Sequence, residues 1–381
     1  MPSADELIST SAAQTLTRTI SAAGPGAGLP ALRAAEQQLS GLSLRERADL
    51  LRDALLTDLP GTYADLARTV RAALAGGPEF TGWLIWPVTS AVAVKAVEAD
   101  AAAAGTPASD AAAFDDALAL LAELTSRLTS EFAIRTLLRH DLDRALGIIA
   151  GWTDSPDADI RRLASEGTRP YLPWSVRVPG IISRPGATVP LLDALYRDES
   201  EFVRRSVANH LNDLSRDNPE LVVQTARRWL ADPAPHTAGL VRRALRTLIK
   251  RGNTDALALL GFTPAAVEVS GPVLASAQVP FEGTVRFTAT IRNTGTEPAR
   301  LAIDYIVHHR KANGTQTGKT FKLTTATLAP GEELAVGRAH SFRPITTRRY
   351  HPGPHAVTLQ VNGVPTARAV FELLPAPVPA V

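Results

Sequence analysis

The sequence predicts a multidomain fold, an all-α solenoid of repeats followed by an all-β sandwich, and three observations support it. Apolar residues recur every three or four positions from residue 30 to residue 260, with short breaks at Gly, Pro, Asp or Ser, which is typical of amphipathic helices. A pair of arginines that follows Ile or Val recurs within that region. After residue 263, apolar and polar residues alternate, as they do in strands.

Composition excludes several classes of protein. Hydrophobic residues make up 45% of the chain, an ordinary share for a globular protein, and the absence of cysteine excludes disulfides and thiolate metal sites. The N-terminus has no apolar core behind a basic start, so it lacks the pattern of a signal peptide. The sequence also lacks an apolar run long enough to span a membrane. We therefore expect a cytoplasmic monomer that has no membrane segment.

The net charge of +2 is unevenly distributed. Residues 1–130 hold 9 basic and 15 acidic residues, residues 131–262 hold 19 and 16, and residues 263–381 hold 12 and 7. The last two thirds of the chain are therefore basic, which favours binding to the phosphates of a nucleic acid. The alternative is codon usage, because only 5 of the 40 basic residues are lysine.

Composition also sets the expected domain boundaries. Residues 1–28 are rich in Ala, Ser, Thr and Gly and end in a GPGAG break, so we expect a weakly structured leader. Residues 29–262 form the expected helical domain, in which the Ala-rich insert at residues 99–113 is a loop or a helix end. The sandwich covers residues 263–375, and residues 376–381 form a loose tail.

A short helix with marked ends stands near the centre of the helical domain. Ser155 is a typical capping residue, and Pro170 and Pro173 end the helix because neither can donate a backbone hydrogen bond. The two prolines stiffen the loop that carries Trp174. Within the helix, a polar stripe at i, i+4 and i+7 ends beside this aromatic loop and consists of Arg162, Glu166 and Arg169.

The arginine pairs mark a repeat. They begin at Arg161, Arg204 and Arg242, spaced by 43 and 38 residues, a period that suits the paired helices of HEAT repeats. Stacked repeats place equivalent helices side by side, so we expect a polar ladder along one concave surface. The alternative is a solvated outer face. Alignment on the second arginine gives three matching sets of positions: Arg162, Glu166 and Pro170; Arg205, Asn209 and Asp213; Arg243, Thr247 and Arg251.

Seven segments of alternating polarity follow residue 263, separated by turns such as NTGTEP and NGVP. They are AAVEVSG, VRFTATIRN, ARLAIDYIVHH, KTFKLTTATL, ELAVGRAHSF, HAVTLQVNG and ARAVFELL. Seven short antiparallel strands predict an immunoglobulin-like sandwich, here without its disulfide. A basic loop that includes Arg343, Arg348 and Arg349 either binds the phosphates of a nucleic acid or is charged only because loops are exposed.

Several sequence motifs of the helical region resemble those of one bacterial protein family. IRRLASEGTRPYLPW, SEFAIRTLL at residues 130–138, GWLIWPV at 82–88 and VRRSVANHLNDLSRDNP at 203–219 are similar to the AlkC family of DNA alkylation repair glycosylases, relatives of AlkD built from HEAT-like repeats. The resemblance covers residues 80–260, and some members also end in an immunoglobulin-like domain. It implies hydrolysis of the bond between deoxyribose and an N-alkylated base, above all 3-methyladenine, in base excision repair without base flipping.

The resemblance also implies catalytic roles. Glu131 is the expected carboxylate that stabilises the sugar cation and holds water, although acidic residues also favour helix starts for electrostatic reasons alone. Asp213 is a second carboxylate, unless it pairs with Arg205 or ends its helix. Trp174 places an aromatic face against the deoxyribose or the base, and a buried loop anchor is the alternative.

DNA binding is assigned to the polar ladder and to the basic loop of the sandwich. Arg162, Arg169 and Arg205 are expected to clasp phosphates, and Glu166 is expected to orient the first two. Phe132 supports the aromatic loop or wedges into a bent duplex, unless it is a core residue. The remaining DNA-binding positions are Asn209, Arg243, Arg348 and Arg349. Packing of the first helices is assigned to Trp83 and Trp86.

The expected partner is double-stranded DNA containing N-alkylated bases, and no cofactor is needed because water is the nucleophile. The eight histidines show no metal-binding spacing, and the neighbours His308 and His309 face opposite sides of a strand. The alternative function is a non-catalytic repeat protein that binds bent, branched or damaged DNA. A protein-binding adaptor is disfavoured because the ladder is cationic.

Overall fold

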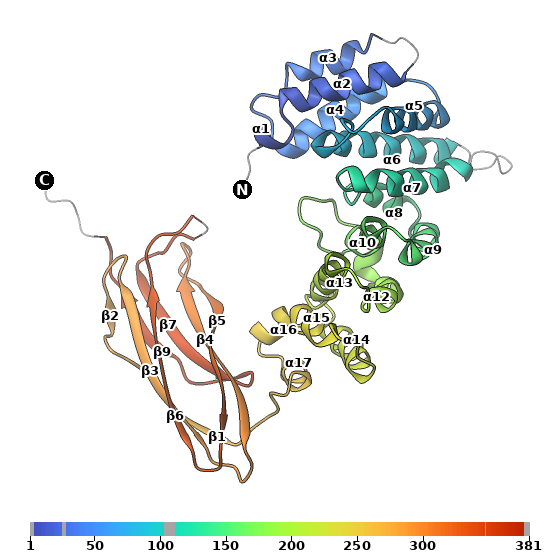
Figure 1. Ribbon diagram of the computed structural model, residues 1–381. Coiled ribbons are helices and arrows are strands. Elements are labelled where there is room, and N and C mark those ends of the chain that lie inside the picture. Colours follow the sequence, from blue (N-terminus) through green and yellow to red (C-terminus); the bar gives the residue numbers. More distant parts are fainter. Residues whose placement is uncertain (1–3, 25–27, 103–110, 347, 377–381) are drawn as a thin grey trace, which may run out of the picture. The chain divides into compact units, whose positions relative to one another are not determined.

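The computed structural model describes residues 4–24, 28–102, 111–346 and 348–376 and divides into two compact units (Figure 1). The first, Met1–Ala244, is helical, and the second, Leu245–Val381, contains two short helices and all of the described strands. The predicted order of helices followed by a β-sandwich is confirmed. Among the helices in the described ranges, none combines the length and apolar character that a membrane span requires.

The N-terminal helices correct the expectation of a weakly structured leader. Ser9 caps a helix by accepting a hydrogen bond from Ala12 N at 3.1 Å, and Leu16 and Ile20 of that helix are buried. These apolar residues stand among many Ser and Thr, which hides the helical period in the composition. Residues 1–3 and 25–27 of the expected leader lie outside the described part. The first helices are α1 (Ala4–Leu7), α2 (Thr10–Ala23), α3 (Pro30–Glu36), α4 (Leu44–Asp58) and α5 (Tyr63–Ala75).

The remaining helices of the first unit carry the predicted site. They are α6 (Ile85–Ala102), α7 (Ala111–Leu124), α8 (Ile134–His140), α9 (Leu142–Gly151), α10 (Ala158–Glu166), α11 (Pro179–Ser183), α12 (Val189–Leu195), α13 (Glu201–Leu214), α14 (Pro219–Ala231) and α15 (Thr237–Ala244). The three helices that carry the arginine pairs, α10, α13 and α15, pack side by side in that order (Figure 1). Of the predicted insert, residues 103–110 lie outside the described part, and its flanks end α6 and begin α7.

In the first two pairs, on α10 and α13, the two arginines make different contacts. The first arginine donates to two carbonyls of the loop before its own helix: Ser155 and Pro156 for Arg161, and Asp198 and Glu199 for Arg204. Arg161 also binds the Asp198 carboxylate at 2.7 Å. The first arginine therefore closes the loop that starts its helix, and the second occupies the polar stripe.

The second unit is a sandwich of two sheets. The alternation of the sequence predicts all of its strands except two, which are too short to alternate, and one of these, β2, runs parallel to β9. One sheet has the order β1 (Val267–Leu274), β3 (Thr284–Asn293), β6 (Glu333–Ser341). The other has the order β2 (Gln278–Val279), β9 (Ala369–Leu373), β7 (Gly353–Val361), β4 (Ala299–Arg310), β5 (Gln316–Leu328), with β8 (Val364–Pro365) beside β7. Their shared core includes Phe287, Ile303, Tyr305, Leu359 and Phe371.

Two short helices, α16 (Arg246–Lys250) and α17 (Thr254–Leu259), belong with the sandwich. Asn362 Nδ2 donates to the carbonyl of Thr263, which follows these helices, at 2.7 Å. Gly252, between them, has a φ of +74°, and a Cβ there would lie 2.8 Å from the Gly363 carbonyl. The compact unit therefore begins before residue 263, the boundary that the sequence pattern suggests.

In the sandwich, the buried His309 and the half-buried His340 lie among aromatic rings. The rings of His309 and His340 lie 5.9 Å apart, and Phe342 packs against both. Burial lowers the pKa of His309 to about 3 and the pKa of His340 to about 4. His308 faces the other side of β4, as the alternation predicts, and its Nε2 lies 3.0 Å from Thr358 Oγ1.

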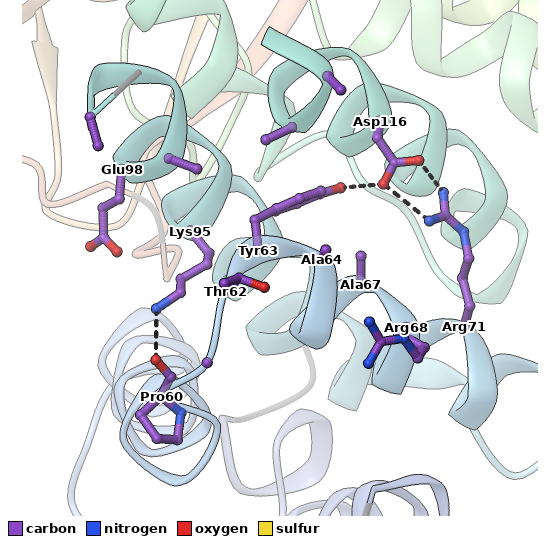
Figure 2. Close-up of a pocket in the computed structure, with 15 residues that line it drawn as sticks. Pro60, Thr62, Tyr63, Ala64, Ala67, Arg68, Arg71, Lys95, Glu98 and Asp116 are labelled. Carbon is purple, nitrogen blue, oxygen red and sulfur yellow. Dashed lines mark hydrogen bonds and ion pairs between the residues drawn. The ribbon is translucent and has the colours of Figure 1, made fainter. Parts of the chain in front are cut away.

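A cavity of about 1260 Å³ opens between α5, α6 and α7 (Figure 2). On one wall, Tyr63 donates to Asp116 at 2.7 Å, and Arg71 binds both oxygens of the same carboxylate. Burial acts to raise the pKa of Asp116, but Arg71 and Tyr63 lower it below its ordinary value. None of the residues that line this cavity is among the site residues predicted from the sequence.

Candidate functional site

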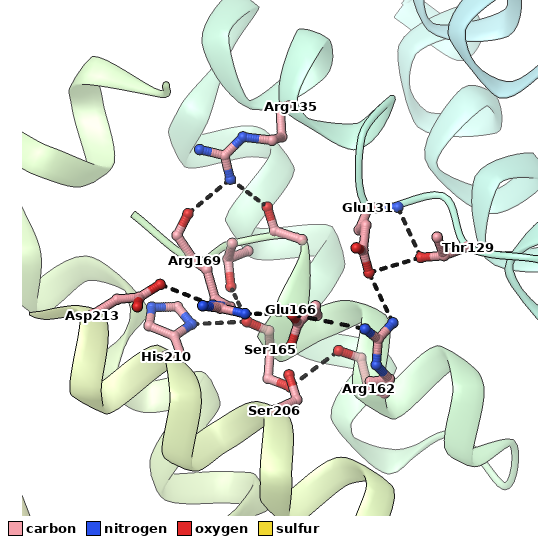
Figure 3. Close-up of polar contacts among 12 residues, drawn as sticks. Thr129, Glu131, Arg135, Arg162, Ser165, Glu166, Arg169, Ser206, His210 and Asp213 are labelled. Atoms are coloured by element: carbon pink, nitrogen blue, oxygen red, sulfur yellow. Dashed lines mark hydrogen bonds and ion pairs between the residues drawn. The ribbon is translucent and has the colours of Figure 1, made fainter. Parts of the chain in front are cut away.

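Five charged side chains, called here the ion series, alternate in sign across the helical unit (Figure 3). Glu131 Oε2 lies 2.9 Å from Arg162 Nη1, and Arg162 Nη2 lies 3.7 Å from Glu166 Oε1. Glu166 Oε1 also lies 2.5 Å from Arg169 Nη1, and Arg169 Nε lies 2.9 Å from Asp213 Oδ2. The predicted polar stripe thus connects the two predicted carboxylates.

Glu131 is fixed in the turn that precedes α8. Thr129 Oγ1 donates to Glu131 Oε2 at 3.0 Å and accepts from the Glu131 backbone N–H at 3.2 Å. The side chain of Glu131 is 12% exposed, so the carboxylate reaches the surface in a defined orientation. Sequence reasoning misses Thr129, although a hydroxyl residue that bonds its own neighbouring backbone is a usual signal at a helix start.

The second half of the ion series depends on close packing between α10 and α13. Ser165 Oγ donates to Ser206 Oγ at 2.6 Å, and His210 Nδ1 lies 2.8 Å from the Ser165 carbonyl. All three residues are buried. Because these contacts hold the two helices together, Asp213 in the last turn of α13 reaches Arg169, which follows the end of α10.

The charges of the ion series stabilise one another. Burial acts to raise the pKa of Glu166, but Arg169 and Arg162 bring it below its ordinary value. Burial acts to lower the pKa of Arg169, yet Asp213 and Glu166 bring it above its ordinary value. Both groups are therefore ionised at neutral pH. Removal of one partner would leave the next charge buried and unpaired.

Arg135 of α8 is a buried cation that holds the loop after α10 (Figure 3). Its Nη1 donates to the carbonyls of Gly167 and Arg169 at 3.0 and 2.8 Å, and its Nε donates to the carbonyl of Val176 at 2.5 Å. Burial lowers the pKa of Arg135 to about 10, so the side chain stays charged. The three carbonyls bracket the loop that carries Trp174. Sequence reasoning gives Arg135 no role, because a contact with backbone carbonyls leaves no signal in residue type.

Four aromatic rings, called here the aromatic series, run from the neighbour of Glu131 to Trp174. Ring centroids are 4.2 Å apart for Phe132 and Trp86, 6.1 Å for Trp86 and Trp83, and 6.5 Å for Trp83 and Trp174. Trp86 is 4% exposed, whereas Trp174 is 55% exposed. Phe132 therefore supports the buried end of the series, and the two tryptophans assigned to packing extend it to Trp174. The alternative of Trp174 as a buried anchor is wrong.

Arg45 of α4 anchors the backbone of Trp174, which is in the left-handed region with a φ of 59°. Its Nη2 donates to the Trp174 carbonyl, and its guanidinium lies 5.9 Å from the ring centroid of Trp86. Arg45 is not among the predicted residues, because its partner is a backbone carbonyl 129 residues away.

The three arginines predicted to clasp phosphates differ in exposure. Arg169 is 8% exposed and lies between two carboxylates, and Arg162 is bonded to Glu131. In this structure both arginines form ion pairs with carboxylates from neighbouring elements. Glu166 contacts both of them, as expected. Arg205 is exposed on α13 and is available to a phosphate.

The polar ladder is formed by two helices and does not continue on the third. Arg205, Asn209 and Asp213 lie one turn apart on α13, beside the stripe of α10. Arg243 is exposed in the last turn of α15. α15 ends directly after it, and the other two positions of the third set belong to the second compact unit. The prediction that Arg243, Thr247 and Arg251 continue the ladder on one helix face is therefore wrong.

The predicted basic loop of the sandwich is present between β6 and β7. Arg349 is exposed and Arg348 is half-buried. The Arg348 backbone N–H donates to the Ile345 carbonyl at 3.0 Å and closes a turn. The loop thus presents at least one arginine to solvent on the second unit.

Comparisons with known proteins agree with this architecture. Residues 268–375 match the model of the C-terminal Ig-like domain of the uncharacterised protein YhaZ. The uncharacterised protein YhaZ of Bacillus subtilis (strain 168) is 34% identical over 251 residues, which are 66% of this chain and 70% of the relative. The structure of Pseudomonas fluorescens alkylpurine DNA glycosylase AlkC bound to DNA containing an abasic site analog is 31% identical, with a TM-score of 0.81 over 98% of this chain and 100% of that one. The chain therefore belongs to the family of AlkC and YhaZ, the AlkC-type DNA glycosylases with a C-terminal immunoglobulin-like domain.

Proposed function

We propose that this chain is a monofunctional DNA glycosylase that hydrolyses the N-glycosidic bond of alkylated bases in double-stranded DNA, foremost 3-methyladenine, in base excision repair. One observation carries the proposal: Glu131 is fixed by Thr129 and Arg162 beside an aromatic series that ends in the exposed Trp174. Similarity to an alkylpurine DNA glycosylase bound to abasic-site DNA supports the reaction class. This substrate would place the protein, as a monomer, at the nucleoid.

The departure of an alkylated base leaves positive charge on the sugar. Alkylation at N3 makes adenine cationic and a good leaving group, so the sugar gains oxocarbenium character as the bond breaks. A carboxylate beside the sugar stabilises that charge, and its effect grows where water is excluded. Glu131, whose side chain is largely buried and rigidly held, suits this role.

The two oxygens of Glu131 have separate tasks in the proposed reaction. Both Thr129 and Arg162 donate to Oε2, so we assign the attacking water to Oε1. The water oxygen attacks the anomeric carbon, and its proton moves to the carboxylate, while the alkylated base leaves with the electrons of the broken bond. No cofactor enters this reaction, because water supplies the nucleophile and the lesion supplies the leaving group.

The remaining predicted residues position the duplex in this proposal. Trp174 places its ring face against the deoxyribose, where a developing cation is attracted to the aromatic quadrupole. Asp213, at the other end of the ion series, is the second carboxylate. The exposure of Trp174 supports an approach to the lesion from outside the duplex, without base flipping. The proposed DNA contacts are Arg205, Asn209, Arg243, Arg348 and Arg349.

Release of free base from duplex DNA containing 3-methyladenine tests the reaction. We expect release by the wild type and a loss of about a hundredfold or more in Glu131→Gln, with unchanged binding to a duplex containing an abasic-site analogue. Glu220→Gln is the matched control, because Glu220 is exposed in the first turn of α14, and it should keep the wild-type rate. Equal rates in all three proteins would remove Glu131 from the mechanism.

The same assay separates catalysis from binding. A wild-type chain that binds the damaged duplex and releases no base would be a non-catalytic protein that recognises bent or damaged DNA. The binding measurement is therefore made on the same duplexes as the release measurement.

A further inference from the structure

Exposed apolar surface in the helical unit is concentrated around the proposed site. Among the described residues of that unit, the large apolar side chains that are exposed are Trp174 at 55%, Phe202 at 48% and Val176 at 38%. Trp174 and Val176 belong to one loop, whereas Phe202 comes from the first turn of α13. An exposed aromatic side chain that no core requires marks a contact surface when it stands beside a functional site.

Phe202 is linked through Arg162 to Glu131, the proposed catalytic carboxylate. The guanidinium of Arg162 lies 4.7 Å from the centroid of the Phe202 ring, and the same guanidinium lies 2.9 Å from Glu131. One face of the ring is therefore covered by Arg162, and the 48% exposure of the side chain leaves the rest open to solvent. Covering one face fixes the ring, so a partner that stacks on the open side meets an ordered surface.

The neighbour of Phe202 on the helix is a cation. Arg205 is three residues further along α13, so the two side chains lie next to each other on one face, and both are exposed. A cation beside a flat ring is the combination that binds a nucleic-acid strand, because the cation takes the phosphate and the ring takes the sugar or the base. Neither a protein core nor a solvated helix face needs this combination.

We propose that Phe202 is a second substrate-binding aromatic residue, whose open face takes the deoxyribose or base of the DNA strand bound at Glu131. The proposal rests on the proposed function, because it presumes that DNA occupies the site. Trp174 and Phe202 then contact the DNA from two different elements, the loop after α10 and the start of α13. Phe202 also shields the pair of Arg162 and Glu131 from solvent when the strand is bound.

Three substitutions test the role of the ring. Phe202→Leu keeps apolar volume and removes the flat face, and Phe202→Tyr keeps the face. Phe262→Leu is the matched control, because Arg300 lies 4.7 Å from the Phe262 ring centroid, the same distance as in the Phe202 pair, in the second unit. We expect Phe202→Leu to bind a duplex with an abasic-site analogue about tenfold more weakly, and the other two variants to bind like the wild type. Equal binding by all four proteins overturns the proposal.

Fluorine resonance gives a readout that a purely structural role would not change. With 4-fluorophenylalanine at position 202, we expect the ¹⁹F signal to shift when the duplex saturates the protein. An unshifted signal overturns the proposal. Loss of base release in Phe202→Leu with unchanged binding also overturns it, because the ring would then act only by holding Arg162.

The outcomes separate this proposal from the proposed function. Base release by the wild type tests the function, whereas the comparison of Phe202→Leu with Phe202→Tyr tests the contact. If the wild type binds the damaged duplex and releases no base, the function fails while the binding comparison still decides the role of Phe202. If the wild type binds no duplex, both proposals are overturned.

Discussion

Arg162 of α10 lies 2.9 Å from Glu131, and this pair joins two segments that are 31 residues apart in the chain. The carboxylate is therefore oriented by a residue of the arginine pair, and the helix that forms the polar ladder also fixes the proposed catalytic group.

Arg162→Met should act on catalysis more than on binding. Because Arg162 is committed to Glu131, we expect base release to fall at least about tenfold, while affinity for an undamaged duplex changes little. Single-turnover release and the salt dependence of binding measure the two effects. A normal rate with a weaker salt dependence would return Arg162 to the group of phosphate ligands.

Arg205→Ala should act on binding. Its side chain is exposed on α13, so we expect the slope of log affinity against log salt concentration to fall by about one counterion. Arg68→Ala is the control, because the Arg68 side chain is 74% exposed on α5 and its salt slope should match the wild type. Identical slopes for the two variants would remove Arg205 from the DNA contacts.

Arg135→Met should unfold more easily and lose activity. Three carbonyls lose their donor, so we expect the free energy of unfolding to fall by about 2–4 kcal/mol and the Trp174 loop to loosen. Arg135→Lys should recover little, because one ammonium group lacks the planar donors that reach all three carbonyls. Urea unfolding measures the stability, with Arg139→Met, an exposed position on the same helix, as control. A urea unfolding curve identical to that of the wild type would contradict the role of Arg135 in holding the loop after α10.

Trp174→Ala should lose base release without losing stability. The side chain is 55% exposed, so we expect the free energy of unfolding to change by about 0.5 kcal/mol or less. Trp174→Phe should recover part of the rate, because it restores an aromatic face. The rates of base release by the two variants, measured on duplex DNA containing 3-methyladenine at equal enzyme occupancy, show whether an aromatic face is needed at this position. A large loss of stability in the alanine variant would show an anchoring role.

Acid should destabilise the sandwich. Burial holds the folded-state pKa of His309 at about 3 and of His340 at about 4, below the value of about 6.5 for an unfolded histidine. The unfolded chain therefore binds protons first, and the free energy of unfolding falls as the pH drops from about 6.5 towards 4. Each histidine contributes about 3 kcal/mol over this interval. Asp304, whose pKa burial raises to about 6, acts in the opposite direction.

His309→Leu tests this dependence. Both ring nitrogens of His309 are buried without a hydrogen-bond partner among the described residues, so an apolar replacement should cost little at neutral pH. We expect urea unfolding at about pH 4.5 to require more denaturant in the variant than in the wild type. If the urea concentration at half-unfolding changed between neutral and acidic pH by the same amount in the variant and in the wild type, His309 would not be the group that titrates.

The sequence shows the residues that carry charge at helical spacing but not those that hold them in place. Glu131 and Asp213 stand in motifs, and the stripe on α10 has the i, i+4 spacing that a helix face requires, so these residues can be selected from the sequence. The pairing of Glu131 with Arg162 and of Asp213 with Arg169 is visible only in the structure. Arg135 and Arg45 bind backbone carbonyls of a distant loop, and any residue type supplies a carbonyl. Their roles depend on the path of the chain and become visible only in the structure.

The boundaries of the fold were harder to predict for related reasons. α2 hides its apolar face among Ser and Thr, so composition suggests a loose leader where a capped helix forms. The helices before residue 263 have a helical pattern like those of the first unit, yet the contact between Gly252 and Gly363 joins them to the sandwich. Pattern alone gives the type of an element, whereas contacts between distant residues decide the unit to which it belongs.

The N-terminal helices are connected to the loop that carries Trp174. Arg45 of α4 holds the Trp174 carbonyl, and Arg47 of the same helix, 3% exposed, donates to the Ile8 carbonyl at 2.9 Å. The recognisable motifs begin only near residue 80. A fragment trimmed to those motifs would keep every proposed catalytic group and lose the donor to the Trp174 carbonyl, so we expect the smallest fragment that releases base to include the first helices.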